Sequence, residues 1–168
     1  MNTTPQTVVA AVEGYAIAGG FGLLCVSDVA ICTEDAGFAM SETAIGIVPA
    51  QIAPFVAARI GVPNTRHLAL TAARFKGPEA LRLGIVHHLA KDSAALDAKL
   101  EEVLKQVDRC APLANALTKA VVIKVGTEPL SSVLDFAADQ FAVARRSPEA
   151  AEGLRAFAEK RPPKWAVE

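Results

Sequence analysis

Glu42 is the residue whose type and position best suit the transfer of a proton. It follows a short apolar run and precedes a loop rich in Gly and Pro. Burial among apolar neighbours would bring the protonation of a carboxylate there into the range that acid/base catalysis uses. The neighbours that we expect to bury it are Met40, Ile45 and Ile47. Taken alone, Glu42 is also explained as a helix-capping or surface acid, because a Ser-Glu pair is common at helix starts.

A glycine-containing turn, residues 14–20, could stabilise negative charge on a carbonyl oxygen. It leads from an apolar run into a helical pattern, and backbone N–H groups in the first turn of a helix lack partners and carry partial positive charge. The consecutive Gly19 and Gly20 would let a ligand oxygen approach these donors, which is the arrangement of an oxyanion site. The other explanation for the glycine pair is close packing of the strand against the helix.

The histidines and cysteines do not indicate a metal site or a disulfide. They are His67, His87, His88, Cys25, Cys32 and Cys110. No histidine stands at metal-ligand spacing from a cysteine or carboxylate, and neighbours on a strand point to opposite faces, so the adjacent histidines cannot easily bind one ion. The cysteines form no CxxC pair, and their odd number fits a reducing compartment, so we expect small buried thiols.

Charge and composition argue against several classes of partner. The 168 residues carry a formal net charge of -1 without a long run of either sign, which does not favour a nucleic-acid surface or a polybasic membrane patch. The apolar stretches are too short to span a membrane and the first residues do not resemble a signal peptide, so we expect a cytoplasmic protein. Basic residues near the C-terminus could contact phosphates, although a solvated terminus explains them equally well. They are Lys160, Arg161 and Lys164.

The first 92 residues alternate short strands with helices, which indicates an α/β region. The predicted strands are Val8–Val12, Gly14–Ile17, Val29–Cys32, Phe38–Met40 and Ile85–Leu89, and the predicted helices after residue 50 are Ile52–Ile60, Pro63–Ala73 and Pro78–Leu83. The first strand is rich in Val and should be buried on both faces, so it needs a neighbour on each side. Either later strands supply both neighbours, or the chain begins in the middle of a sheet.

From Ser93 onward the apolar spacing is helical throughout. The predicted helices are Ser93–Arg109, Pro112–Val125, Leu130–Ala144 and Pro148–Glu159, the last with Ser147 as its cap. We therefore divide the chain into an α/β part, residues 1–92, and a helical part, residues 93–168. Because 52% of the residues are hydrophobic, we expect a partner to cover the apolar surface that so small a chain cannot bury.

Taken together, these segments resemble the enoyl-CoA hydratase/isomerase (crotonase) superfamily. The matching segments are Val9–Gly20, Asp28–Ile31, Phe38–Pro49, Leu70–Phe75 with Gly84–Val86, and Glu152–Arg161. The resemblance implies an α/β crotonase-like ββα spiral, with its N-terminal part missing, followed by a helical C-terminal region that forms the contacts of a homotrimer or of a hexamer of two trimers. It implies no separate cofactor, because coenzyme A is part of the substrate.

The resemblance also implies roles for single residues. Gly19 matches one backbone donor to the oxyanion of the thioester, and the second donor belongs to a loop that would precede Val8. Hydratases of the family use two glutamates, of which the second matches Glu42 and the first falls at Gly22. Contacts with the acyl-CoA are further expected at Ala18, Gly20, Gly22 and Lys160.

Three functions are compatible with this resemblance. The leading expectation is hydration of an α,β-enoyl-CoA, including a branched glutaconyl-type substrate, because the run Val48–Phe55 looks most like hydratases of that kind. A Δ3,Δ2-enoyl-CoA isomerase with a single glutamate is the first alternative. The second is a truncated, catalytically inactive oligomerising fragment, since the upstream oxyanion donor is absent.

Overall fold

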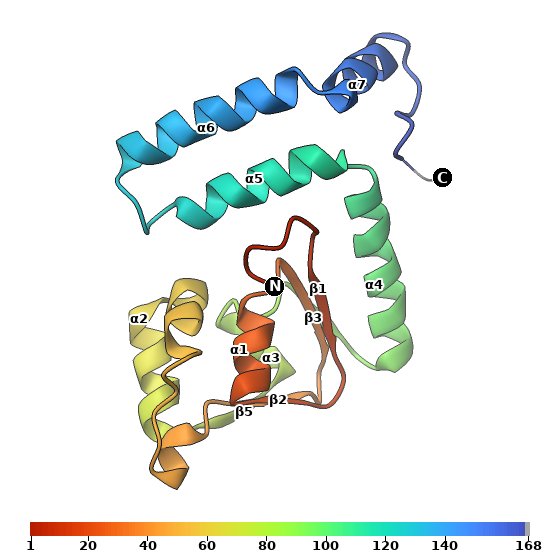
Figure 1. Cartoon of the computed structure of the whole chain (residues 1–168). Helices are drawn as coiled ribbons and strands as arrows, with labels where there is room; N and C mark the ends of the chain where they lie inside the picture. The colour runs from red at the N-terminus through yellow and green to blue at the C-terminus, as the bar shows by residue number, and fades with distance from the viewer. Residues whose placement is uncertain (167–168) are drawn as a thin grey trace. The chain divides into compact units, whose positions relative to one another are not determined.

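The computed structural model describes residues 1–166 and divides into two compact units (Figure 1). The first unit comprises Met1–Asn2 and Val8–Glu102, and the second comprises Thr3–Thr7 and the chain from Val103 onward. The first unit holds the strands and the second is helical. This division falls inside a helix that begins at Ser93, rather than at the start of that helix.

Two small sheets form the first unit. One has the order β1-β3-β6 and is parallel throughout, with β1 at Val9–Val12, β3 at Val29–Thr33 and β6 at His88–Ala90. The other has the order β2-β4-β5, with β2 at Tyr15–Ile17, β4 at Gly37–Ala39 and β5 at Arg74–Lys76. In the second sheet β2 runs parallel to β4, whereas β5 runs antiparallel to it.

Helices connect these strands. They are α1 at Gly19–Cys25, the 3-10 helix η1 at Glu42–Ile45, α2 at Ala53–Thr71 and α3 at Gly77–Arg82. The two helices predicted on either side of Gly61 run on as α2, with a kink at Gly61, where φ is 77° and ψ is 159°. That backbone conformation is open to glycine at little steric cost, which explains why the helical pattern breaks there.

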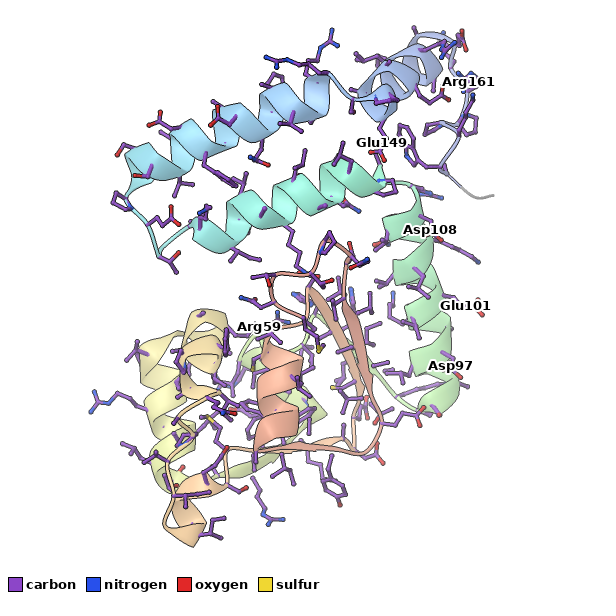
Figure 2. The ribbon with its side chains drawn as sticks, in the orientation of Figure 1. Arg59, Asp97, Glu101, Asp108, Glu149 and Arg161 are labelled. Carbon is purple, nitrogen blue, oxygen red and sulfur yellow. The ribbon has the colours of Figure 1, made fainter. Side chains whose placement is uncertain are left out.

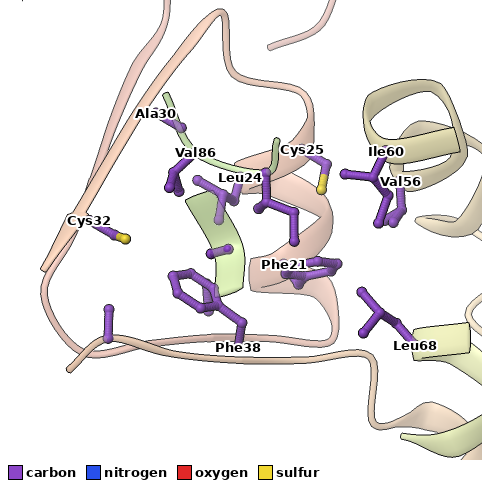
Figure 3. Packing of buried hydrophobic residues seen from close by; sticks show 14 of the residues in the cluster. Phe21, Leu24, Cys25, Ala30, Cys32, Phe38, Val56, Ile60, Leu68 and Val86 are labelled. Carbon is purple, nitrogen blue, oxygen red and sulfur yellow. The ribbon is translucent and has the colours of Figure 1, made fainter. Parts of the chain in front are cut away.

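An aromatic cluster joins α1 to the second sheet. Phe38 pairs with Ala16 on one side and with Phe75 on the other, so these three side chains form one row across the sheet. Phe21 of α1 lies with its ring centroid 6.5 Å from that of Phe38 and 6.1 Å from that of Phe75. Figure 3 shows Phe21 and Phe38 of this cluster together with Val56 of α2. Alternation along β4 turns Phe38 into the core, which fixes the register of the sheet.

The structure differs from the sequence analysis at two strands. Within the described residues β1 pairs with β3 alone and Ala11 is exposed, so later strands do not supply both of the neighbours that would bury β1. The sequence analysis also missed β5, because Arg74-Phe75-Lys76 is a short polar stretch with one apolar residue. It becomes a strand through its pairing with β4, which local sequence does not reveal.

The second unit contains most of the helical region, and its helix bounds agree with those predicted to within one residue. The helices are α4 at Ser93–Asp108, which begins in the first unit, α5 at Pro112–Lys124, α6 at Leu130–Arg145 and α7 at Pro148–Ala158. The Ser147 hydroxyl caps α7 by accepting the Ala150 N–H at 3.1 Å, as predicted. Glu149, labelled in Figure 2, lies in the first turn of α7, but its carboxylate accepts a hydrogen bond from the Leu113 N–H in the first turn of α5, at 3.0 Å.

An ion pair between a buried glutamate and a half-buried arginine holds the chain that follows α7. Glu152 is 8% exposed. Its carboxylate accepts hydrogen bonds from Nη1 of Arg161 at 2.8 Å and from the backbone N–H of Lys164 at 3.2 Å. The hydrogen bond from Arg161 lowers the pKa of Glu152. Trp165 lies against Gly153, where an added Cβ would stand 3.0 Å from the indole ring and would crowd it.

Burial of the thiols follows the prediction for two cysteines and contradicts it for the third. Cys25 and Cys32 are buried, but Cys110 is exposed at the end of α4. None of the helices described over residues 1–166 is long and apolar enough to cross a bilayer.

Candidate functional site

The parallel pair β2 and β4 brings the glycine turn and the glutamate to the same edge of the sheet. Ile17, the last residue of β2, is paired with Ala39, the last residue of β4. Beyond this pair the Ala18 N–H donates to the Ala39 carbonyl at 3.1 Å and continues the ladder by one step. One strand then leads to Gly19 and the other to Glu42, and carboxyl ends of parallel strands are where α/β proteins place ligand sites.

Glu42 is buried with an unpartnered oxygen. Glu42 is the first residue of η1 and is only 8% exposed. No described residue donates a hydrogen bond to its Oε2. A buried carboxylate oxygen without a partner is unfavourable for the fold, so such a group is retained where it meets a ligand or a proton. The explanation of Glu42 as a surface acid is therefore wrong, and the Ser41 side chain forms no cap.

The surroundings of Glu42 differ in part from the prediction. Met40 is buried, as expected, but Ile45 and Ile47 are more than half exposed. The segment is instead held by hydrogen bonds. The Glu42 carbonyl accepts the Ile47 N–H at 3.2 Å, and the Thr43 hydroxyl donates to the Ala69 carbonyl of α2 at 2.6 Å. The loop that carries Glu42 is thus tied to the end of α2.

Gly19 and Gly20 present bare backbone rather than a packing surface. Both are exposed, and a Cβ added at either would meet no described heavy atom within 4 Å. Close packing of strand and helix therefore does not explain this glycine pair. As the first residues of α1 they carry N–H groups that the helix leaves without an internal acceptor. A ligand oxygen can reach these donors directly.

Ala18 fixes the direction of the Gly19 N–H. Its φ is 50° and its ψ is -121°, a backbone conformation that residues other than glycine rarely adopt. The Ala18 N–H is bound to Ala39, and its carbonyl accepts the Gly22 N–H at 3.1 Å. The Ala18 carbonyl and the Gly19 N–H lie in one peptide plane, so the hydrogen bond from Gly22 to that carbonyl orients the Gly19 N–H, while the bond to Ala39 holds the preceding plane. This arrangement is maintained at the expense of local strain at Ala18.

Gly22 lies against the residue that precedes α2. A Cβ added at Gly22 would stand 2.7 Å from Cβ of Ile52 and closer still to its Cγ2. Real Cβ atoms do not approach other carbons so closely, so only glycine fits at this position. Gly22 is buried, in contrast to Gly19 and Gly20.

Lys160, the remaining predicted contact, belongs to the second unit. It is exposed, follows α7 and has a positive φ of 53°. Its neighbour Arg161, for which a phosphate contact and a solvated terminus were equally good explanations, is bound to Glu152 and Glu159. The role of Lys160 in binding the substrate stays a prediction.

Sequence reasoning overlooked a polar cluster in the first unit centred on Arg59 of α2 (Figure 2). Its guanidinium donates to the carbonyls of Ser27 and Ile85, each at 2.9 Å. His87 Nδ1 lies 3.5 Å from the same guanidinium and accepts the Ala30 N–H of β3 at 2.9 Å. Burial, and then Arg59, lowers the pKa of His87, so the ring is held neutral. The sequence signal for this cluster was Arg59 itself, a charged residue within an apolar helical segment.

Comparisons with known proteins show the family of the chain. A model of the enoyl-CoA hydratase/isomerase family matches residues 1–168. The chain belongs to this family. Carnitinyl-CoA dehydratase of Citrobacter koseri is 34% identical over 165 residues, which cover 95% of this chain and 63% of that protein.

Two solved structures have the same fold. Pseudomonas aeruginosa AtuE is 55% identical with a TM-score of 0.95, and an enoyl-CoA hydratase/isomerase from Marinobacter aquaeolei is 49% identical with a TM-score of 0.94. Each match covers 99% of this chain, and 64% and 63% of the solved chains, respectively. The predicted crotonase-like fold is thus confirmed, and the chain spans a little under two thirds of the length of these relatives.

Proposed function

We propose that this chain acts on an α,β-enoyl-CoA thioester and adds water across its double bond. The observation that carries the proposal is the buried, unpartnered Oε2 of Glu42 at the strand edge that also bears the exposed Gly19 backbone. The first supplies a group for proton transfer and the second a donor for the thioester oxygen. Carnitinyl-CoA dehydratase, a relative by sequence, is named for removal of water, the reverse direction of the same chemistry.

The proposed reaction needs only one carboxylate. Water attacks the β-carbon as the Glu42 carboxylate takes a proton from it, and the carbon-carbon double bond shifts to give an enolate. The Gly19 N–H donates to the enolate oxygen. Glu42 then returns its proton to the α-carbon, so one water is consumed and the carboxylate is restored.

Isomerisation is the second candidate, and one observation favours it. The first turn of α1 has glycine at position 22, so α1 offers no second carboxylate. A single carboxylate is enough to take a proton from the α-carbon of a β,γ-enoyl-CoA and return it to the γ-carbon. The oxyanion donor would serve the dienolate formed between the two transfers.

Mass spectrometry separates these candidates. We expect the 168-residue chain, incubated with but-2-enoyl-CoA and with a branched glutaconyl-type thioester, to give a product heavier by one water. Incubation with but-3-enoyl-CoA tests isomerisation, whose product has the mass of the substrate and is therefore identified by its chromatographic separation from it. Glu42→Gln is the matched control and should remove turnover by about 10²–10⁴-fold. Absence of turnover on all three substrates would leave the oligomerising fragment as the function of this chain.

Assembly is proposed on separate grounds. Large apolar side chains of α6 and α7 are exposed, among them Phe141, Leu154 and Phe157. Such side chains support the expected homotrimer or hexamer, because an uncovered surface of this kind is unfavourable in water. Light scattering after gel filtration should give a mass of three or six chains, and a monomer would contradict the proposal. A cytoplasmic location stays a prediction.

A further inference from the structure

The junction between α1 and the start of α2 has room for one side chain, and Ile52 supplies it. Cβ of Ile52 would lie 2.7 Å from a Cβ at Gly22, whereas its Cα would lie 3.7 Å away. Rotation about χ1 moves the methyl groups of Ile52 but not its Cβ. The close approach is therefore a property of the backbone at both positions, and no change of rotamer can make space for a side chain at position 22.

Position 22 follows the proposed oxyanion donor by one turn of α1. Residues three apart on a helix lie on one face, so Gly22 lies one turn below Gly19 on α1. Ile52 is half-buried, packs against the hydrophobic core and is fixed by its N–H to the Pro49 carbonyl at 3.2 Å. The loop that ends at Ile52 begins with η1 and therefore with Glu42.

We infer that Ile52 is a specificity-determining residue of this site. It fills, with an aliphatic group, the position from which α1 could otherwise present a second acid or base, and it makes Glu42 the carboxylate on which proton transfer depends. This inference rests on the proposed function. It predicts that the site selects reactions in which one carboxylate handles every proton, and that the reacting carbons meet an apolar wall on the α1 side.

A set of stability measurements tests the packing without reference to activity. Gly→Ala inside a helix normally raises stability. We expect Gly22→Ala instead to lower the melting temperature of the protein by several degrees, because the added Cβ meets Ile52. In the Ile52→Ala background the loss should persist, since that variant keeps Cβ. In the Ile52→Gly background the sign should reverse and Gly22→Ala should raise the melting temperature.

Gly20→Ala is the matched control for this set. It adds a Cβ to the same helix at a position with no described heavy atom within 4 Å, so it should not lower the melting temperature. A Gly22→Ala variant as stable as the wild type would overturn the packing argument. So would an Ile52→Ala background that relieves the loss as fully as Ile52→Gly. If Gly22→Ala does not fold, the two double variants still give the comparison.

The role in specificity is tested by the pH profile of kcat for but-2-enoyl-CoA hydration. Wild type and Ile52→Gly should each show the ionisation of one carboxylate. Gly22→Glu in the Ile52→Gly background should add a second ionisation and raise kcat by about tenfold or more over Ile52→Gly alone. A profile identical to that of Ile52→Gly would refute the role of Ile52. Absence of turnover in the wild type would refute the proposed function, and with it this role, while the stability set is judged separately.

Discussion

Replacing Glu42 with methionine should stabilise the protein while it removes proton transfer. Methionine has nearly the volume of glutamate and carries no oxygen, so the substitution removes the orphaned Oε2 without leaving a cavity. An unsatisfied buried polar atom costs about 1–3 kcal/mol, and more when it is charged. For a chain of this size each kcal/mol corresponds to roughly 2–4 °C in melting temperature.

Two further variants make this prediction specific. Glu42→Gln keeps a polar group in the same place but removes the charge, so its melting temperature should lie between those of the wild type and Glu42→Met. Glu152 is the matched control, because it is equally buried but its oxygens are bound by Arg161. Glu152→Met leaves the Arg161 guanidinium with Glu159 as its remaining carboxylate partner and removes the acceptor of the Lys164 N–H, and it should therefore lower the melting temperature.

Calorimetry of the three variants, together with the hydration assay, gives the result. We expect opposite signs of the stability change for the two glutamates, and a loss of activity of about 10²–10⁴-fold in both Glu42 variants. A lower melting temperature for Glu42→Met would show that Oε2 has a stabilising partner in solution. The reasoning from an unpaired catalytic carboxylate would then be wrong.

Other consequences of the structure can be tested with single variants. Ala18→Gly should raise the free energy of unfolding by about 1 kcal/mol, because it removes the strain of a positive φ, and should weaken turnover by freeing the peptide plane before Gly19; unchanged urea denaturation would contradict this. His87 has a lowered pKa, so the folded state binds fewer protons than the unfolded state and stability should fall as the pH drops below about 6.5. His87→Asn keeps an acceptor that does not titrate, and should flatten this dependence in urea titrations. Alkylation of the native protein at neutral pH should modify Cys110 alone, as read by peptide mass mapping, because burial raises the pKa of Cys25 to about 12 and of Cys32 to about 11.

Much of the helical structure could be predicted because its signals are local. Pro112 and Pro148 stand in the first turns of their helices, and Ser147 caps the last. The backbone kink at Gly61 likewise follows from a single residue. Each of these signals acts within one turn of the chain, so the sequence is sufficient to place it.

The candidate site was predicted in its members but not in its packing. Glu42 and Gly19 were singled out by their types and neighbours, and the resemblance to the family supplied their roles, which stay predictions. Gly22 and Ile52 are far apart in the sequence, and neither residue by its type or its neighbours predicts their contact. The strand at Arg74–Lys76 escaped for the same reason, since pairing with β4 alone makes it a strand. Ile45 and Ile47 are apolar and were expected to be buried, but the path of the loop leaves them exposed.

The short pair β2 and β4 has a consequence for how substitutions in the core will be read. Three residues on each strand set the offset between Gly19 and Glu42, and the row Ala16, Phe38 and Phe75 holds that offset. The packing of these core side chains therefore determines the relative position of the two candidate site residues. A substitution at Phe38 that shifts the strands by a fraction of a residue would look like an active-site defect in an assay, although its side chain lies in the core, away from the edge where a ligand would bind.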